Sequence, residues 1–163
     1  MSDELMTWLR ATIEGDKAAS EAAEAASPGP WVNSGQAGLG DAWQIHGAPT
    51  EESGVEWNDE VGDVVRVPSR VATLNYEDGG GVWAREAAEH IVLQQPMHTI
   101  ARCEVELAIL DLCERERAEW PGHRSWDSES DQGVARAGAL EDAVRRLAYG
   151  YRHRPGWREE WKP

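Results

Sequence analysis

The stretch from Val82 to Ala118 constrains the fold most, because it is the longest part of the chain with apolar residues at helical spacing. Pro96 divides this stretch. Proline lacks an N–H group and disfavours helical dihedrals in the residue before it, so we predict a first helix that ends near Gln94. Proline also suits the first position of a helix, and a second helix can therefore begin on Pro96. The stretch predicts a long central helix that is broken once.

Two adjacent apolar rows run along the second of these helices. The first row consists of Met97, Ile100, Cys103, Leu107 and Leu110, and the second of Ala101, Val105, Ala108 and Leu112. Together they predict a wide buried stripe. The opposite side carries Arg102, Glu106, Asp111, Glu114 and Arg117, which we expect in solvent. We predict that this helix is the centre of the core, although its second row could equally be buried in a homodimer.

An amphipathic helix is also predicted at the start of the chain. Ser2 can cap it, and the two acidic residues that follow suit the positive end of the helix dipole. Residues 27–30, Ser-Pro-Gly-Pro, end this helix near Ala26, because proline and glycine favour turns. Trp31 follows directly, and we predict that it anchors the turn on the core.

The residues between Trp31 and the central helix favour a small antiparallel sheet. Residues 42–46, 63–67 and 70–75 are predicted strands, separated by Gly-rich or acidic loops. We predict that the last two strands pair as a hairpin through Pro68 and Ser69.

The predicted fold class is α+β. Its parts are an N-terminal helix (1–26), a small antiparallel sheet (31–76), a long broken central helix (82–118), a polar loop (121–132) and a C-terminal helix with a packed tail (133–163). Asp131 can cap the last helix, which should end near Gly150. A chain of 163 residues can bury a sizeable core. We therefore expect a single domain over residues 1–163.

The net charge of −14 is unevenly distributed along the chain. Residues 1–60 hold 12 acidic and 2 basic side chains, residues 61–132 hold 14 and 7, and residues 133–163 hold 4 and 7. Direct nucleic-acid binding usually requires a basic footprint, so this charge argues against it. No apolar run approaches the roughly 20 residues that span a bilayer, and the N-terminal residues do not resemble a secretory signal. We expect a cytoplasmic protein with no membrane segment.

The cysteine and histidine patterns predict neither a disulfide nor a metal site. Cys103 and Cys113 lie ten residues apart on one predicted helix, which separates them by about 15 Å, and a disulfide needs Cα atoms within about 7 Å. His90 and His98 lack the spacing of zinc ligands, so we expect His90 to cover the helix junction. Gly79–Gly81 precedes a helix but lacks the Lys-Ser/Thr of a P-loop. We predict no cofactor and no metal.

The C-terminal tail is the most informative candidate for a binding site. Basic residues alternate with aromatic ones there: Arg152, Arg154, Arg158 and Lys162 with Tyr149, Tyr151, Trp157 and Trp161. This pattern is typical of nucleotide or RNA stacking with phosphate contacts. In the alternative, which we favour, the tryptophans clamp onto the body while the arginines pair with its acidic surface. The candidate binding residues are Trp31, His90, Arg154, Trp157, Arg158 and Trp161.

Three stretches of the sequence, taken in order, resemble a known family. They are residues 26–31 (Ala-Ser-Pro-Gly-Pro-Trp), residues 87–111 (beginning Ala-Ala-Glu-His-Ile, with Gln95-Pro96 inside and Ile-Leu-Asp at the end) and residues 154–161 (Arg-Pro-Gly-Trp-Arg-Glu-Glu-Trp). Together they are similar to an uncharacterised family, one of the domains of unknown function, from actinobacteria and their phages. The resemblance implies such a source and assigns no activity.

Three functional classes are compatible with these patterns. We favour a non-enzymatic accessory or interaction protein, of an actinobacterium or its phage, that binds a host or self protein partner through its acidic surface. In one variant, carboxylates in residues 51–60 or 104–119 mimic nucleic-acid phosphates. The second class is a small-ligand protein that holds a nucleotide between tryptophans and the arginines of the tail. The third is a hydrolase or nuclease, which needs carboxylates or histidines clustered around a cleft.

Overall fold

The structure is a computed structural model that describes residues 2–36, 43–48, 55–58, 63–66, 70–72, 82, 84–119 and 128–163. In chain order its elements are α1 (Asp3–Ala26), β1 (Val32–Gln36), β2 (Trp43–His46), β3 (Val55–Asn58), β4 (Asp63–Arg66), β5 (Arg70–Ala72), α2 (Arg85–Leu93), α3 (Pro96–Glu119), α4 (Ser128–Gly150) and the short 3₁₀ helix η1 (Glu159–Trp161). The chain forms two compact units. We call residues 1–17 with 101–163 the helical unit, and residues 18–100 the sheet unit.

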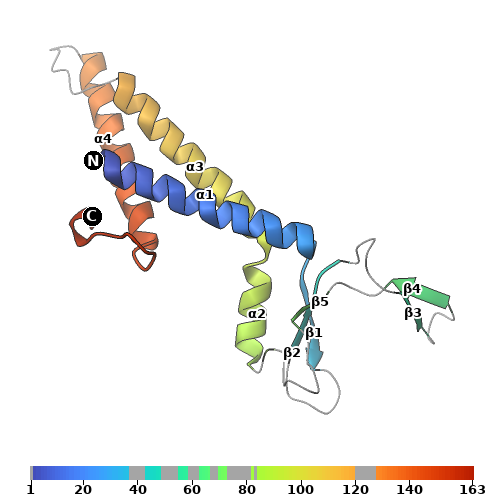
Figure 1. The fold of residues 1–163 in the computed structure, drawn as a ribbon. Helices are drawn as coiled ribbons and strands as arrows, with labels where there is room; N and C mark the ends of the chain where they lie inside the picture. Colours follow the sequence, from blue (N-terminus) through green and yellow to red (C-terminus); the bar gives the residue numbers. More distant parts are fainter. Residues whose placement is uncertain are drawn as a thin grey trace. The chain divides into compact units, whose positions relative to one another are not determined.

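The helical unit packs α1, α3, α4 and the tail around one hydrophobic core (Figure 1). Ser2 caps α1, as predicted, because its Oγ accepts a hydrogen bond from the backbone N–H of Leu5 at 3.3 Å. The buried core residues are Leu5, Met6, Leu9, Ile13, Cys103, Leu110, Cys113, Val144, Ala148 and Trp161. They recur at helical spacing, so each helix contributes one stripe to the core.

Helix α3 buries a narrower apolar stripe than the sequence predicts. Cys103 and Leu110 of the first row are buried, but Val105 of the second row is 61% exposed. Glu106, predicted to lie in solvent, is buried instead. The reason is that α3 meets its neighbours along one stripe, where Tyr151 donates a hydrogen bond to the Glu106 carboxylate and offsets the cost of its burial. The second row is therefore not buried within the chain, which contradicts the prediction of a wide stripe in the core.

The sheet unit contains a three-stranded antiparallel sheet in the order β1-β2-β5 and a two-stranded antiparallel pair, β3-β4. Val32 of β1 pairs with His46 of β2, and Ile45 of β2 pairs with Ala72 of β5. Helix α2 lies against β1 and β2. Ile45 of β2 and Ala88 of α2 are both fully buried. Helix α2 therefore packs on this small antiparallel sheet.

The predicted hairpin between residues 63–67 and 70–75 was wrong, because β4 pairs with β3 while β5 pairs with β2. Strands β1 and β3 also lie in segments that the sequence did not predict as strands. The alternation of apolar and polar residues along a strand is a local signal. Which strand it pairs with depends on contacts with distant residues. The predicted α+β class, with its helices and small antiparallel sheet, is confirmed.

The predicted break in the central helix is also confirmed. Helix α2 ends at Leu93 and α3 begins on Pro96. Helix α4 ends at Gly150 as predicted, but it begins at Ser128, earlier than the predicted cap at Asp131. Helical residues therefore extend into the segment that was predicted to be a polar loop.

Two predictions about covalent and membrane features can also be compared with the structure. Cys103 and Cys113 are free and buried, in agreement with their spacing. Among the described residues, no helix is both long and apolar enough to cross a membrane. The Gly79–Gly81 segment lies outside the described residues.

Candidate functional site

The tail after α4 folds back onto the start of α1 (Figure 1). The indole N–H of Trp8 donates a hydrogen bond to the carbonyl oxygen of Pro155 at 2.9 Å. The Trp8 ring also contacts two rings of the tail, with centroid distances of 5.7 Å to Trp157 and 5.2 Å to Trp161. Trp161 is only 6% exposed. Each such aromatic pair contributes roughly 0.5–1.5 kcal/mol beyond the area that it buries, so this cluster holds the tail against α1.

Two ion pairs complete the attachment of the tail. Arg154 Nη2 lies 2.7 Å and 2.6 Å from the two carboxylate oxygens of Asp16. Arg158 Nη1 lies 2.7 Å from Glu4 Oε2, and its guanidinium carbon lies 5.4 Å from the centre of the Trp161 ring. Both arginines are about half exposed, so each ion pair contributes about 1 kcal/mol or less. The aromatic contacts therefore provide most of the stabilisation.

Gly156 allows the tail to approach α1 closely. Its φ of +87° lies in the region that favours glycine. A Cβ at this position would lie 2.8 Å from Trp8 Nε1, which is too close for any other residue. The segment 154–161 thus acts as a clamp on α1. The candidate residues Arg154, Trp157, Arg158 and Trp161 all take part in it, as the favoured interpretation predicts.

The turn before β1 is held by a side chain from the junction of α2 and α3. Buried Gln95 accepts, through Oε1, a hydrogen bond from the backbone N–H of Trp31 at 2.9 Å. The indole N–H of Trp31 donates to the carbonyl oxygen of Ser27 at 2.8 Å. Glu24 Oε1 accepts from the backbone N–H of Gly29 at 3.0 Å. The candidate residue Trp31 therefore lies in an anchored turn within the sheet unit.

Three exposed apolar side chains lie around this turn, and we call them the junction patch. Leu93 is 66% exposed, Val32 51% and Met97 45%. Leu93 and Met97 flank Gln95 along the chain, and a Cβ at Gly29 would lie 3.5 Å from the sulfur of Met97. Single exposed apolar residues are ordinary on protein surfaces, whereas contiguous apolar patches mark contact surfaces. Val32 and Met97 adjoin the turn at Trp31 and Gly29, and Leu93 lies two residues before Gln95.

His90 is exposed in the last turn of α2. The junction contact that the sequence assigned to His90 is made by His98, whose Nδ1 lies 3.2 Å from the carbonyl oxygen of Leu93. Within the described part of the chain, no group of three or more His, Cys, Asp or Glu residues could hold a metal ion. The two histidines are thus placed at the helix junction without forming a metal site there.

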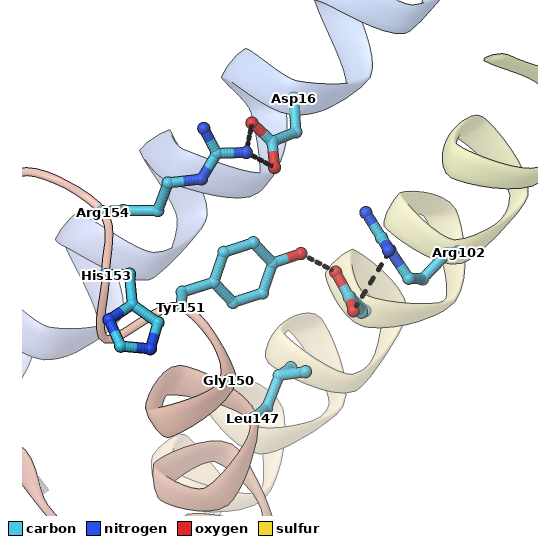
Figure 2. Close-up of a pocket in the computed structure, with 8 residues that line it drawn as sticks. Asp16, Arg102, Leu147, Gly150, Tyr151, His153 and Arg154 are labelled. Atoms are coloured by element: carbon cyan, nitrogen blue, oxygen red, sulfur yellow. Dashed lines mark hydrogen bonds and ion pairs between the residues drawn. The ribbon is translucent and has the colours of Figure 1, made fainter. Parts of the chain in front are cut away.

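A cavity of about 330 Å³ opens where α4 ends in the helical unit (Figure 2), and we call it the α4 cavity. Its polar and charged lining residues are Asp16, Arg102, Glu106, Tyr151, His153 and Arg154. Tyr151 donates a hydrogen bond of 2.5 Å to Glu106 Oε2. Arg102 Nε lies 3.8 Å from the other oxygen of Glu106. The cavity therefore joins residues from α1, α3 and the tail.

Burial is the main cause of the pKa shifts of Tyr151, Cys103 and Cys113. It raises the pKa of Tyr151 above the usual value, and the hydrogen bond to Glu106 raises it further. Tyr151 therefore remains a hydrogen-bond donor at neutral pH. Burial also raises the pKa of the Cys103 and Cys113 thiols. Neither cysteine is thus suited to be a thiolate nucleophile.

Sequence reasoning missed the partners of the candidate residues. Trp8 lies on the apolar face of α1, which predicts burial but not contact with the tail. Asp16 and Glu106 are two acidic residues among 30, and nothing local distinguishes them. Gln95 stands directly before Pro96, and a buried glutamine that binds a distant backbone N–H has no sequence signal. The missing information in each case is a contact between distant segments.

Comparison with known families gives one result. A model of a family of unknown function, DUF6221, matches residues 2–163. The chain belongs to this family. The predicted membership in a family of unknown function is therefore confirmed. The DUF6221 match covers the anchored turn, the clamp and the helices that hold them. No curated protein and no solved structure matches the chain.

Proposed function

We propose that this DUF6221 protein is a non-enzymatic accessory protein of an actinobacterium or its phage, and that it binds a basic protein partner in the cytoplasm through its sheet unit. The junction patch carries the proposal, because Val32, Leu93 and Met97 are exposed around a turn that Gln95 holds in place. A contact surface on an ordered scaffold loses little conformational freedom when a partner covers it. The patch therefore suits the centre of an interface.

The charge of the sheet unit indicates the kind of partner. Residues 18–100 hold 13 acidic and 3 basic side chains, a net charge of −10, whereas the rest of the chain holds 17 and 13, a net charge of −4. Complementary charge speeds association and excludes partners of like charge. Two sheet units would repel each other, so we propose a different protein, with an apolar contact surrounded by basic residues, rather than a second copy.

The acidic residues of α3 are poorly suited to mimicry of nucleic acid. Several α3 carboxylates already pair within the chain, as Lys17–Glu104, Arg10–Asp111, Arg10–Glu114 and Arg136–Glu116. A carboxylate that is already neutralised is a poor substitute for a phosphate. If the protein does occupy a basic groove, residues 18–100 are the more suitable part.

A hydrolase or nuclease is supported less well than an interaction protein. Such an enzyme needs a carboxylate or histidine that is available to act as a base or to bind a metal. In the α4 cavity the two carboxylates are engaged, Asp16 by Arg154 and Glu106 by Tyr151. These pairs favour a structural or binding role for the cavity.

The proposal is tested by affinity capture from an actinobacterial lysate, followed by binding measurements with the purified partner. The decisive variant is L93S/M97Q, which makes two residues of the junction patch polar. V105S is the matched control, because Val105 is also an exposed apolar residue but lies in the helical unit. We expect L93S/M97Q to weaken binding roughly tenfold to a hundredfold. Full burial of one such side chain contributes about 1.5–3 kcal/mol, and the exposed fractions of Leu93 and Met97, 66% and 45%, leave about one side chain's surface to bury. V105S should bind like the wild type.

Two further results bear on the kind of partner. Binding should weaken as the salt concentration rises, because salt screens the charge of the sheet unit. Equal binding by L93S/M97Q and V105S would contradict the proposed surface. A stable homodimer that L93S/M97Q dissociates, measured by sedimentation, would show that the partner is a second copy of the chain.

A further inference from the structure

The carboxylates of the α4 cavity are largely buried and already paired (Figure 2). The side chain of Glu106 is 12% exposed and that of Asp16 is 18% exposed. Tyr151 donates to one oxygen of Glu106, and Arg154 Nη2 contacts both oxygens of Asp16. The charge of Asp16 is compensated by Arg154, and that of Glu106 by Arg102, whose Nε lies 3.8 Å from Oε1. The cavity wall therefore carries no net negative charge that would repel an anion.

The arginines of the cavity are much more exposed than the carboxylates. The side chain of Arg102 is 48% exposed and that of Arg154 is 52% exposed. Arg154 uses Nη2 for both contacts with Asp16, and its Nε and Nη1 make no hydrogen bond to a described residue. His153 also lines the cavity, is exposed and adds a ring N–H. The groups that reach solvent are therefore mainly cationic donors, which suit phosphate and carboxylate oxygens.

The cavity also has an apolar side and a limited size. Leu147 and the ring of Tyr151 line it, together with Gly150. An aromatic ring can stack on a planar group or contact a sugar. The volume of about 330 Å³ lies at the lower end of the range of roughly 300–1,000 Å³ for small-molecule sites. A compact ligand with one anionic end and one flat or apolar end fits these features.

We propose that the α4 cavity binds a small phosphate monoester of the nucleoside monophosphate class. A phosphate monoester presents three acceptor oxygens, which suit the remaining N–H donors of two guanidinium groups and an imidazole better than the two oxygens of a carboxylate. Arg102, Arg154 and His153 hold the phosphate, while Leu147 and Tyr151 contact the nucleoside. The cavity belongs to the helical unit, so this binding is separate from the junction patch of the sheet unit.

Calorimetric titration of the full-length protein tests the proposal with three probes: adenosine 5′-monophosphate, adenosine and inorganic phosphate. We expect the monophosphate to bind most tightly, phosphate more weakly, and adenosine without detectable affinity. The main variant is R102Q. R115Q is the matched control, because Arg115 is an exposed arginine on the same helix and does not line the cavity. R102Q should weaken binding of the monophosphate about tenfold or more, because it removes a charge-assisted hydrogen bond to the phosphate.

A second variant separates binding from folding. Arg154 also belongs to the clamp, so its replacement could release the tail, whereas His153 is exposed and has no partner within the described residues. H153Q should therefore weaken binding of the monophosphate and leave the melting temperature unchanged. The proposal is overturned if the wild type does not bind the monophosphate at about 5 mM, if adenosine binds equally well, or if R102Q and R115Q have the same affinity.

Discussion

Gly156 and Tyr151 have surroundings that tolerate little change. Gly156 has a positive φ and faces the ring of Trp8 at a distance that excludes a side chain. Tyr151 links the tail to the buried carboxylate of Glu106. In both cases the constraint comes from a partner on another helix. Replacing either residue therefore tests a contact between distant segments rather than a preference of the local backbone.

Replacing Gly156 with alanine should destabilise the protein. A left-handed conformation costs a residue other than glycine about 1–2 kcal/mol, and contact with Trp8 adds to that cost. We expect a loss of about 2 kcal/mol or more, equivalent to roughly 5 °C in melting temperature, measured by circular dichroism.

The matched control for G156A is G138A. Gly138 lies inside α4, and a Cβ there would meet nothing within 4 Å. Alanine favours a helix interior by about 1 kcal/mol over glycine, so G138A should raise the melting temperature. If both variants shifted stability in the same direction, the stated role of Gly156 would be incorrect.

The stability of the protein should fall at alkaline pH in a way that depends on Tyr151. Burial and the hydrogen bond to Glu106 raise the pKa of Tyr151 in the folded state. The unfolded chain loses this proton near pH 10, so the contribution of Tyr151 is complete below about pH 10 and is lost above it. Urea unfolding at a series of pH values should show a steeper fall above about pH 10 for the wild type than for Y151F.

Y151F also has an effect at neutral pH that checks the assignment. It leaves the buried Glu106 carboxylate without the donated hydrogen bond, which costs about 1–3 kcal/mol. Parallel pH profiles for the two proteins would rule out a folded-state shift at Tyr151. Equal stability at pH 7 would mean that water replaces the hydroxyl at no cost.

At the scale of elements, the tail is a structural part of the helical unit rather than an appendage. Its 3₁₀ helix η1 presents Trp161 to the core, and Trp157 packs against both Trp8 and Trp161. The turn before β1 has the same character, because Gln95 at the α2–α3 junction holds Trp31. Both segments are ordered by contacts with helices that are distant in sequence.

A chain that ends at Gly150 should therefore be less stable than the full chain. Loss of a buried tryptophan alone costs about 3–5 kcal/mol, so we expect the melting temperature to fall by roughly 10 °C or more. The control is a chain that lacks only Lys162 and Pro163, which are exposed. It should melt like the wild type. An unchanged melting temperature after truncation at Gly150 would contradict the interpretation that the tail stabilises the helical unit as a clamp.

At the scale of the whole molecule, the acidic excess determines behaviour in solution. The net charge is −14, and residues 18–100 supply most of it. Charge of one sign keeps molecules apart and steers them toward partners of the opposite sign. The same negative charge thus favours the proposed binding of a basic protein and keeps free molecules of this chain apart.

This excess predicts self-association near the isoelectric point of about 4.7. Repulsion between molecules vanishes there, so light scattering should rise as the pH approaches this value and fall again at neutral pH. Far-ultraviolet circular dichroism distinguishes association of folded molecules from acid unfolding. A solution that stays clear at its isoelectric point would show that repulsion is not what keeps the molecules apart.

The sequence alone determined the features that depend on neighbouring residues. The cap at Ser2, the break at Pro96 and the end of α4 at Gly150 follow from backbone dihedrals and side-chain spacing within a few residues, and the structure contains all three. Only the tertiary structure decided the strand pairing, the burial of Glu106 and the contact of the clamp with Trp8. These depend on which distant surfaces meet, and a local pattern carries no information about that choice. The α4 cavity also depends on tertiary structure, because it forms where α1, α3, the end of α4 and the tail come together.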